Sequence, residues 1–591
     1  MRNFLHRIHE KILWLKRLPE RQLIIILSFV VGLLSGLAAV LLKNTVHGIQ
    51  ELLTSWFQTG AESLLYLLYP GAGMLLALLY VRYVVKDDIG HGVTKVLYAI
   101  SRKDSKIKRH NTYSSMVASS VTIGLGGSVG AEAPIVYTGA ALGSNIAKFF
   151  RLDYRYITLM LGCGAAGAVA GIFKAPLAGI VFTLEILMLD LTLSSIVPLL
   201  VSSVTAAAVS YLMLGDTVSF SNSVAPFNMW NLPYYIVLGV CCGFGALYFT
   251  RATLALESRL KKIEGVFHRW LLCAAGLGLL IFLFPPLYGE GYGSLTSLLH
   301  SDSVNAAGNV LYESISSNVW FILLFFLAVF FFKVVSMSLT NSGGGVGGTF
   351  GPTLFMGGIA GFIVARLINL LGIHEVPEAN FVLVGMAGMM SGVMHAPLTA
   401  IFLIAEITGG YDLLMPLMLA SAASFITIRG FERHSIYTKR LALRGELITH
   451  NKDKAVLTML QVDKLVETDF SIVSPDNTLG QLVKILSRSS RNLFPVVDDT
   501  AALVGIVLLD DIRGIMFDTG NYEVVRVRDV MKLPPALVAT GESMQSVLDK
   551  FEVSGAWNLP VVDENGQYVG FVSKSKIFSS YRNMLQQFSD E

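Results

Sequence analysis

One acidic residue stands in a stretch of small residues that is suited to hold an anion. The stretch "GGSVGAEAP", residues 126–134, carries Glu132 and ends on Pro134. Glycine lets backbone N–H groups come close to a guest, and a proline near a helix start leaves the neighbouring N–H groups free. Such a helix start favours an anion by charge and by hydrogen bonding. Glu132 is itself an anion and can occupy the site when the substrate is absent. The same residues also fit a glycine-rich helix contact with one snorkelling glutamate.

The composition indicates a polytopic membrane protein with some soluble mass attached. Of its 591 residues, 53% are hydrophobic and 15% are charged, whereas a soluble domain averages about 25% charged residues. The cysteines lie in apolar segments without the spacing of metal ligands, so neither a disulfide framework nor a metal site is expected. They are Cys163, Cys241, Cys242 and Cys273. No nucleophile–base pair rises above chance, so we do not expect an enzyme.

Residues 21–445 are predicted to form the membrane domain, after an amphipathic cytoplasmic segment at 1–20. The apolar run Leu23 to Leu42 is long enough to span and has no clear cleavage site, which favours a transmembrane helix over a removed signal. Several later apolar segments have only ~10–15 residues, too few to cross a core of ~30 Å at ~1.5 Å per residue. Half-helices that meet at mid-membrane line ion sites in transporters. The later segments are expected at about 64–85, 113–125, 132–149, 156–170, 176–189, 195–214, 232–252, 267–285, 319–339, 349–371, 379–393, 397–408 and 414–428.

Loop charge predicts the orientation of the chain. The N-terminal segment and the stretches 86–109, 251–269 and 429–454 are basic, whereas 215–231 and 286–318 contain no Lys or Arg. The positive-inside rule places the basic group in the cytoplasm and the other group outside. We therefore expect an integral protein of the cell (plasma or inner) membrane with both termini in the cytoplasm.

An internal repeat divides the membrane domain. The segment "FKAPLAGIVFTLEI" at 173–186 aligns without a gap with "MHAPLTAIFLIAEI" at 394–407, and the glycine-rich stretch before Pro134 recurs at 343–352. The segments that lead into the two glycine-rich stretches start from opposite faces, which implies an inverted repeat with its site between the halves. The repeated acids, Glu185 and Glu406, fit structural carboxylates near helix ends. Lys333, in the second lead-in segment, is expected to snorkel or to be paired.

Two further clusters complete the pattern. They are "GHGVT" at 90–94 and Tyr437 within "ERHSIYTKRLALRG", where the last membrane segment gives way to basic residues. Alone, the histidine fits a loop or capping residue and the tyrosine fits an interfacial one.

Together these clusters resemble the CLC family of chloride channels and chloride/proton antiporters, from about residue 20 to 445. The family motif GREGP or GKEGP corresponds to "GAEAP" at 130–134, GxFxP to "GTFGP" at 348–352 and GSGIP to "GHGVT". The family segment FNAPLAGILF corresponds to "FKAPLAGIVF" at 173–182, and the pore tyrosine falls on Tyr437.

The resemblance implies that Glu132 is the gating glutamate, which competes with chloride and carries the proton. Backbone amides at 349–350 with the Tyr437 hydroxyl are expected at the central anion, and amides around 131–133 at an outer site. Neutral donors and helix ends bind an anion weakly enough to release it. The expected anion-binding residues are Gly90, His91, Gly92, Ala131, Ala133, Thr349, Phe350, Gly351 and Tyr437.

Three departures from the family pattern matter. His91 stands where the family has a serine; its ring either donates to the anion, with pH dependence near a reference pKa of about 6.5, or points away. Ala131 replaces a basic residue and removes an attraction for anions. Ile186 replaces a second glutamate on the inner proton route and cannot relay a proton. Protons then reach Glu132 by water or through another residue such as His91, or coupling is absent.

The chain past about residue 455 changes to a soluble α/β pattern with a second repeat. Leu479, Leu482, Val483 and Leu486 have helical spacing, and Met544, Val547, Leu548 and Phe551 follow at an offset of 65 residues. "PVVD" at 495–498 recurs at 560–563 at the same offset. The two β-α-β-β-α units resemble a pair of CBS domains, expected at 458–520 and 521–591 after a linker at 446–457.

The ligand motif of the CBS pair is incomplete. Asp511 has Leu508 where a hydroxyl is expected, and Ser573 has Lys576 where a carboxylate is expected. Asp511 and Ser573 are thus the candidates for holding an adenine nucleotide. We favour a structural or regulatory dimerisation role over nucleotide sensing, and no other cofactor is expected.

The sequence therefore predicts an all-α polytopic membrane domain, a CLC-type inverted repeat with broken half-helices, followed by α/β tandem CBS domains. The predicted function is chloride transport gated by Glu132, with proton-coupled exchange favoured over a passive, voltage- or pH-gated chloride channel. A CBS-based nucleotide or ionic sensor with little flux is the alternative from another class. Expected partners are chloride and other small anions, protons, the lipid bilayer and a second copy of the chain, with one pathway per subunit, and no nucleic acid.

Overall fold

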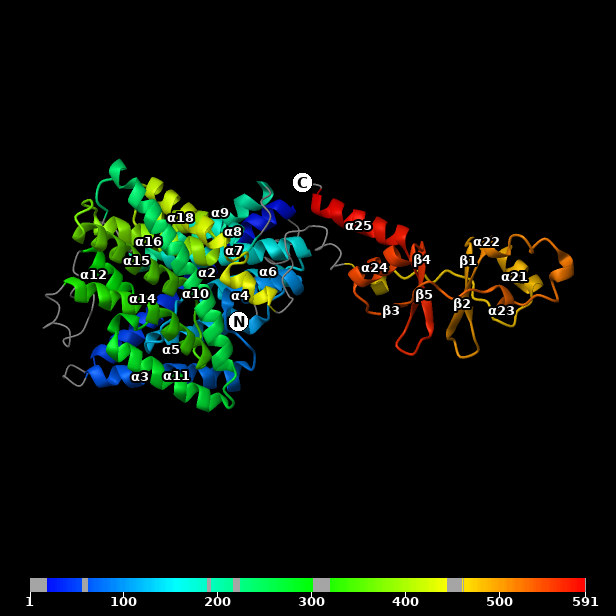
Figure 1. The fold of residues 1–591 in the computed structure, drawn as a ribbon, viewed down its shortest axis with the longest axis horizontal. Coiled ribbons are helices and arrows are strands. Elements are labelled where there is room, and N and C mark those ends of the chain that lie inside the picture. The colour runs from blue at the N-terminus through cyan, green and yellow to red at the C-terminus, as the bar shows by residue number, and fades with distance from the viewer. Residues whose placement is uncertain are drawn as a thin grey trace, which may run out of the picture. The chain divides into compact units, whose positions relative to one another are not determined.

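The computed structural model describes residues 19–55, 62–188, 193–215, 224–300, 319–443, 460 and 462–589. The chain divides into two units near residue 447, a helical unit and a smaller α/β unit. The predicted linker at 446–457 and nearly all of the N-terminal segment 1–20 lie outside the described residues. Figure 1 shows the elements of each unit.

The regular elements described in the first unit are helices joined by loops. In chain order its helices are α2 (Glu20–Ser55), α3 (Glu62–Leu79), α4 (Gly92–Arg102), α5 (Ser114–Gly124), α6 (Glu132–Phe149), α7 (Tyr154–Phe173), α8 (Pro176–Glu185), α9 (Leu193–Leu214), α10 (Leu232–Lys261), α11 (Val266–Leu283), α12 (Tyr292–Leu299), α14 (Val319–Ser342), α15 (Phe350–Leu370), α16 (Glu378–Met394), α17 (Pro397–Ile407), α18 (Leu414–Arg429) and α19 (Ile436–Ala442). Among the described residues, eight helices are long and apolar enough to cross a membrane. The apolar helices α8, α16, α17 and α18 are shorter, as the short segments predicted.

Within each half, small residues bring two neighbouring helices into close contact, α6 with α7 in the first half and α15 with α16 in the second. A Cβ on Gly139 of α6 would lie 2.1 Å from the carbonyl oxygen of Gly164 on α7. A Cβ on Gly357 of α15 would likewise lie 2.4 Å from the carbonyl oxygen of Gly385 on α16. Backbones approach this closely in membrane helix pairs only where side chains are minimal. The same contact in both halves confirms the internal repeat.

Each half also places a carboxylate on a helix start of the other half. Glu406, near the end of α17, accepts hydrogen bonds from the N–H groups of Leu177 (3.0 Å) and Ala178 (2.8 Å) at the start of α8. Glu185, at the end of α8, accepts from the N–H groups of Leu398 (3.1 Å) and Thr399 (2.8 Å) at the start of α17. Each acid satisfies amide groups that a helix start leaves without an intrahelical partner. Both acids are structural, as predicted.

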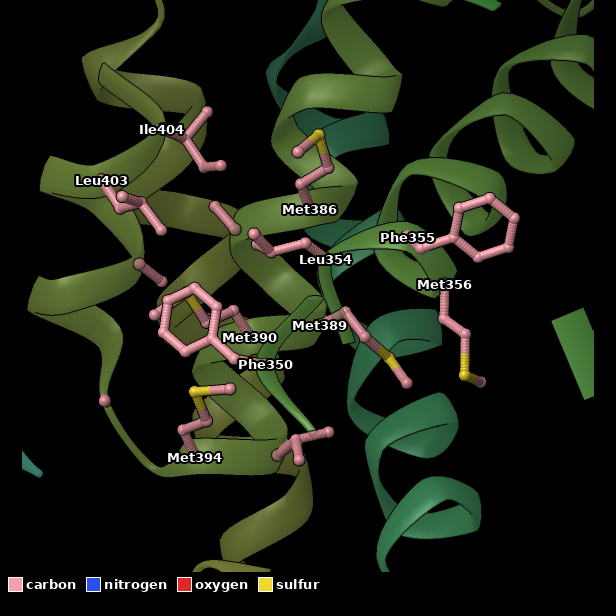
Figure 2. Packing of buried hydrophobic residues seen from close by; sticks show 14 of the residues in the cluster. Phe350, Leu354, Phe355, Met356, Met386, Met389, Met390, Met394, Leu403 and Ile404 are labelled. Atoms are coloured by element: carbon pink, nitrogen blue, oxygen red, sulfur yellow. The ribbon is translucent and has the colours of Figure 1, made fainter. Parts of the chain in front are cut away.

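The start of α15 is anchored in the apolar core. Figure 2 shows Phe350 and Leu354 of α15 among methionines of α16 and Leu403 and Ile404 of α17. The ring of Phe350 also lies 5.4 Å from that of Phe173. Methionine fills irregular gaps between helices, so the first turn of α15 has a fixed position.

The second unit contains two related α/β repeats. Strands β1 (Leu493–Val497) and β2 (Leu503–Leu508) pair antiparallel; β4 (Asn558–Val562) pairs antiparallel with β5 (Tyr568–Ser573) and parallel with the short β3 (Val538–Ala539). Both antiparallel pairs shift register between the two valines of "PVV", at Val496/Val497 and at Val561/Val562. Helices α21 (Leu479–Leu486) and α24 (Met544–Ser554) cover separate apolar clusters. The irregularity recurs at the predicted offset of 65 residues. The remaining helices of this unit are α22 (Leu509–Ile512), α23 (Val527–Val530) and α25 (Lys574–Ser589).

Candidate functional site

The two glycine-rich stretches meet in the interior of the helical unit. The N–H of Gly130 donates to the carbonyl of Gly348 (3.1 Å), and the N–H of Gly348 donates to the carbonyl of Gly130 (2.7 Å). A Cβ on Gly130 would lie 2.1 Å from Oε2 of Glu132, and one on Gly348 would lie 2.7 Å from Cβ of Ala133. Only glycine allows this approach. The pairing places the starts of α6 and α15 side by side.

The Glu132 carboxylate lies at the start of α15. Its Oε2 accepts a hydrogen bond from the N–H of Gly351 (3.2 Å), and its Oε1 accepts one from the hydroxyl of Tyr292 (2.8 Å). The residue is 2% exposed. A buried carboxylate on a helix N-terminus stands in for an external anion because it meets the same donors and the same partial positive charge.

Two more helix starts border this position. A Cβ on Gly92, the first residue of α4, would lie 2.3 Å from the carbonyl oxygen of Ala133 on α6. The hydroxyl of Tyr437 on α19 is buried and accepts a hydrogen bond from Oγ1 of Thr349 (3.3 Å). The structure thus brings together Gly92, Ala133, Glu132, Thr349, Phe350, Gly351 and Tyr437 from the predicted set. Neutral amides and hydroxyls of this kind can hold an anion without trapping it.

His91 turns its ring toward an acid on another helix. The residue precedes α4 with a left-handed backbone (φ 54°). Its Nε2 lies 3.6 Å from Oε2 of Glu257 on α10, and Oε1 of Glu257 accepts from Nη2 of Arg440 (2.7 Å). Of the two orientations that the sequence left open, the structure shows the ring directed at Glu257. The N–H of Gly90 donates to Oδ1 of Asp88 (3.1 Å), so this predicted anion contact is already taken by a carboxylate.

The predicted outer site is also occupied by a protein group. The N–H of Ala131 donates to Oε1 of Glu290 (2.8 Å), a residue in the loop before α12. In this structure a carboxylate of the protein takes the amide of Ala131, and anion binding there stays a prediction. Sequence reasoning missed Glu290, Tyr292 and Glu257 as site residues. The signal for the first two was "GEGY" at 289–292, an acid and a hydroxyl among glycines in a stretch without Lys or Arg.

Lys333 is paired in the interior and does not snorkel. Its Nζ donates to Oγ of Ser128 (2.9 Å) and to the carbonyl of Gly289 (3.0 Å), and it lies 4.7 Å from the centre of the Phe355 ring. The residue is fully buried. A basic side chain thus lies behind the glycine-rich stretch although Ala131 itself is neutral.

Ile186 is buried after the last turn of α8. Its neighbour Glu185 is held by the start of α17. Isoleucine carries no exchangeable proton, so position 186 offers no proton-carrying side chain.

The candidate ligand residues of the second unit have protein partners. Oδ1 of Asp511 accepts from Nζ of Lys532 (2.6 Å). Oγ of Ser573 donates to Oε1 of Glu467 (2.8 Å) and accepts from the N–H of Lys576 (3.2 Å). A nucleotide at either residue must compete with these contacts.

Comparison with known proteins decides the family. The family model described as voltage gated chloride channel matches residues 72–429, more than half of the chain. The chain belongs to this CLC family. The CBS domain model matches residues 462–518 and 527–583 of the same chain. The membrane domain and the tandem CBS domains that the sequence predicted are both confirmed.

Relatives of this CLC chain include chloride channels and exchangers. A putative chloride channel protein ClcB-like of Ralstonia nicotianae is 28% identical over 438 residues, which cover 70% of this chain and 95% of that protein. The H(+)/Cl(-) exchange transporter ClcA of Vibrio cholerae is 27% identical over 444 residues, which cover 71% of this chain and 89% of that protein.

Solved structures support the same fold. A slow cyanobacterial Cl-/H+ antiporter matches with a TM-score of 0.63 at 22% identity, over 72% of this chain and 98% of that chain. A eukaryotic CLC transporter matches with a TM-score of 0.59 at 18% identity, over 94% of this chain and 97% of that chain.

Proposed function

We propose that this CLC protein exchanges chloride for protons across a cell membrane, with Glu132 as the group that serves both substrates. The observation that carries the proposal is the Glu132 carboxylate on the Gly351 amide at the start of α15. An anion of the protein already occupies a position built for an anion. Relatives named as H(+)/Cl(-) exchange transporters support the coupling to protons.

The proposed cycle follows from the donors around Glu132. Protonation neutralises the carboxylate and weakens its hold on the amide of Gly351, so the side chain leaves and chloride takes its place. Amides at 349–351 and the hydroxyl of Tyr437 then face the anion, while Gly92 and Ala133 form the adjoining wall. When Glu132 loses its proton it returns and expels the anion. Chloride and the charged Glu132 carboxylate occupy the position in turn. Chloride entry therefore alternates with proton release, which couples the two flows.

Exchange is tested in liposomes that contain the purified full chain. An imposed chloride gradient is expected to drive protons against their own gradient in the wild type. Glu132→Gln removes the charge and the exchangeable proton, so uphill proton movement is lost while chloride flux persists. Chloride flux without any proton movement in the wild type would show a passive channel instead.

A passive, gated chloride channel is the second candidate. The observation that favours it is buried Ile186, because an exchanger needs a proton route from the inner side and this side chain offers none. In the exchange proposal, water or His91 supplies that step. The liposome assay separates the two, since a channel equilibrates chloride and leaves the pH unchanged.

We further propose a homodimer in the cell membrane with cytoplasmic termini and one pathway per subunit. Large apolar side chains are exposed on α8, α17 and α18, including Leu177, Leu398, Met415 and Met418. Such side chains face either lipid or a second subunit. Light scattering of the detergent-solubilised protein is expected to give the mass of two chains, and one chain would contradict the dimer.

The CBS pair has a structural or regulatory role in this proposal. Asp511 and Ser573 are engaged by Lys532 and Glu467, so an adenine nucleotide finds no free hydroxyl and carboxylate together. Calorimetry on the full chain is expected to show no binding of ATP, ADP or AMP. Tight binding would favour the sensor alternative.

A further inference from the structure

The loop before α12 presents a half-buried carboxylate, Glu290, to the site. Gly289 and Gly291 both adopt positive φ, 59° and 86°, on either side of Glu290. The N–H of Gly289 donates to the carbonyl of Gly126 (3.2 Å), and a Cβ on Gly291 would lie 2.5 Å from the ring of Phe355. The loop is therefore tied both to the glycine-rich stretch and to α15. Glycine is needed on both sides of the acid because the backbone must turn tightly there.

Glu290 does at the start of α6 what Glu132 does at the start of α15. Its Oε1 accepts from the N–H of Ala131 at 2.8 Å, and Oε2 of Glu132 accepts from the N–H of Gly351 at 3.2 Å. The two helix starts are joined by the Gly130–Gly348 pairing. Two protein carboxylates thus occupy two adjoining anion positions.

The charged groups that face Glu290 come from four helices. Glu132 of α6 repels the Glu290 carboxylate, whereas Lys43 of α2 and Lys333 of α14 attract it. Tyr292 of α12 interacts electrostatically with both acids. Nζ of Lys333 also bonds the carbonyl of Gly289, next to the acid. Like charges in a buried site raise the free energy of ionising both. The protonation of one acid therefore affects the other.

We propose that Glu290 is a second gating carboxylate, which covers the Ala131 amide until it takes up a proton and then yields that amide to an incoming anion. The proposal rests on the exchange function of Glu132. The loop lies in the stretch without Lys or Arg that is assigned to the outer side, so Glu290 takes its proton from outside. The proton goes to the carboxylate, the bond to Ala131 breaks, and the negative charge beside Glu132 disappears. Tyr292 follows Glu290 by two residues and bonds Glu132, so movement of this loop reaches both acids.

A structural cap is the competing account of the same contact. Under that account Glu290 only satisfies the amide of Ala131, and its charge is irrelevant. Glu290→Gln keeps an oxygen that can accept from Ala131 but removes the charge and the titration. The variant therefore separates gating from capping.

The experiment measures chloride flux into proteoliposomes against external pH and external chloride. Glu290→Gln is expected to lower the half-saturating external chloride concentration by about tenfold, or about 1.4 kcal/mol of binding free energy, because it removes a competing negative charge. It should also remove one of the two titrations of the wild-type flux, and Glu132→Gln should remove the other. Glu375→Gln, at an exposed position between α15 and α16, is the matched control and should behave as the wild type. A Glu290→Gln profile equal to that of the wild type overturns the proposal.

Glu290→Gln removes the negative charge that faces the amine of Lys333, and a second variant keeps the test decisive if this change prevents folding. Glu290→Asp keeps the charge but shortens the reach to Ala131, so both titrations should remain while flux at neutral pH rises. Unchanged flux in a folded Glu290→Asp protein also overturns the proposal. If Glu132→Gln abolishes proton coupling while the Glu290 variants match the wild type, the exchange function is supported and the gating role of Glu290 is contradicted. If Glu132→Gln has no effect, the exchange function itself falls.

Discussion

Nε2 of His91 lies 3.6 Å from Oε2 of Glu257, and Arg440 binds the other oxygen of that carboxylate. Glu257 and Arg440 are almost fully buried, with side chains 6% and 8% exposed. The histidine ring therefore adjoins a buried ion pair and makes no capping hydrogen bond at the start of α4. The family serine is replaced here by a residue whose ring is engaged on another helix.

The first prediction concerns the anion selectivity of a His91 variant. His91→Ala removes the ring without adding a hydroxyl, so the chloride-to-nitrate permeability ratio should stay within about twofold of the wild type. The backbone is left-handed there (φ 54°), and both histidine and alanine carry a Cβ, so the substitution should leave the backbone strain nearly unchanged. Tyr437→Phe is the control, since it removes a hydroxyl from the site and should change the ratio. A changed ratio in His91→Ala would show that the ring contacts the anion.

The second prediction tests the hydroxyl that holds Glu132. Tyr292→Phe removes the hydrogen bond to Oε1 of Glu132 (2.8 Å) and leaves the packing of the ring intact. A hydrogen bond to a charged group contributes about 1.5–3 kcal/mol, so the population of the blocked state should fall by a factor of about ten to a hundred. Chloride flux at neutral pH should rise while proton coupling persists. An unchanged flux in reconstituted vesicles would mean that Tyr292 does not hold the gate closed.

The third prediction uses the symmetry of the repeat. Glu185→Ala removes the hydrogen-bond acceptor of two amide groups at the start of α17. Glu406→Ala does the same at the start of α8. Loss of such a cap costs about 0.5–2 kcal/mol. The two variants should therefore lower the thermal stability of the protein by similar amounts. Glu375→Ala, at an exposed position, should leave it unchanged, and a loss in only one of the two cap variants would contradict their equivalence.

The fourth prediction concerns pH and the segment that carries Tyr437. Burial alone would raise the pKa of Glu432, but hydrogen bonds from Lys439 and Arg251 outweigh it and hold the pKa below its ordinary value of 4.5. A lowered folded-state pKa stabilises the protein above the ordinary value, and this stability is lost as the pH falls through the lowered one. Glu432→Gln should thus cost about 1 kcal/mol at pH 7. The difference from the wild type should shrink below pH 4.5, and thermal unfolding at pH 7 and at acid pH measures it.

The sequence predicted the parts of this protein that local pattern determines. The short apolar segments, the glycine-rich stretches and the two repeats are visible as spacing, and the structure confirms them. The contacts of Glu290 with Ala131 and of Glu257 with Arg440 join residues 159 and 183 positions apart. No periodicity reports such a contact, and a backbone amide looks the same in a sequence whether it is free or bonded. The orientation of His91 depended on where α10 lies, which spacing alone could not give.

The exchanged carboxylates of α8 and α17 have an evolutionary consequence. Two identical half-length chains that paired about a twofold axis would make both contacts from a single acid, because residue i meets residue j and j meets i. Fusion of two copies of one ancestral gene preserves this geometry within one polypeptide. In such a fused chain each half can diverge, so an acid such as Glu132 can stand in one half alone.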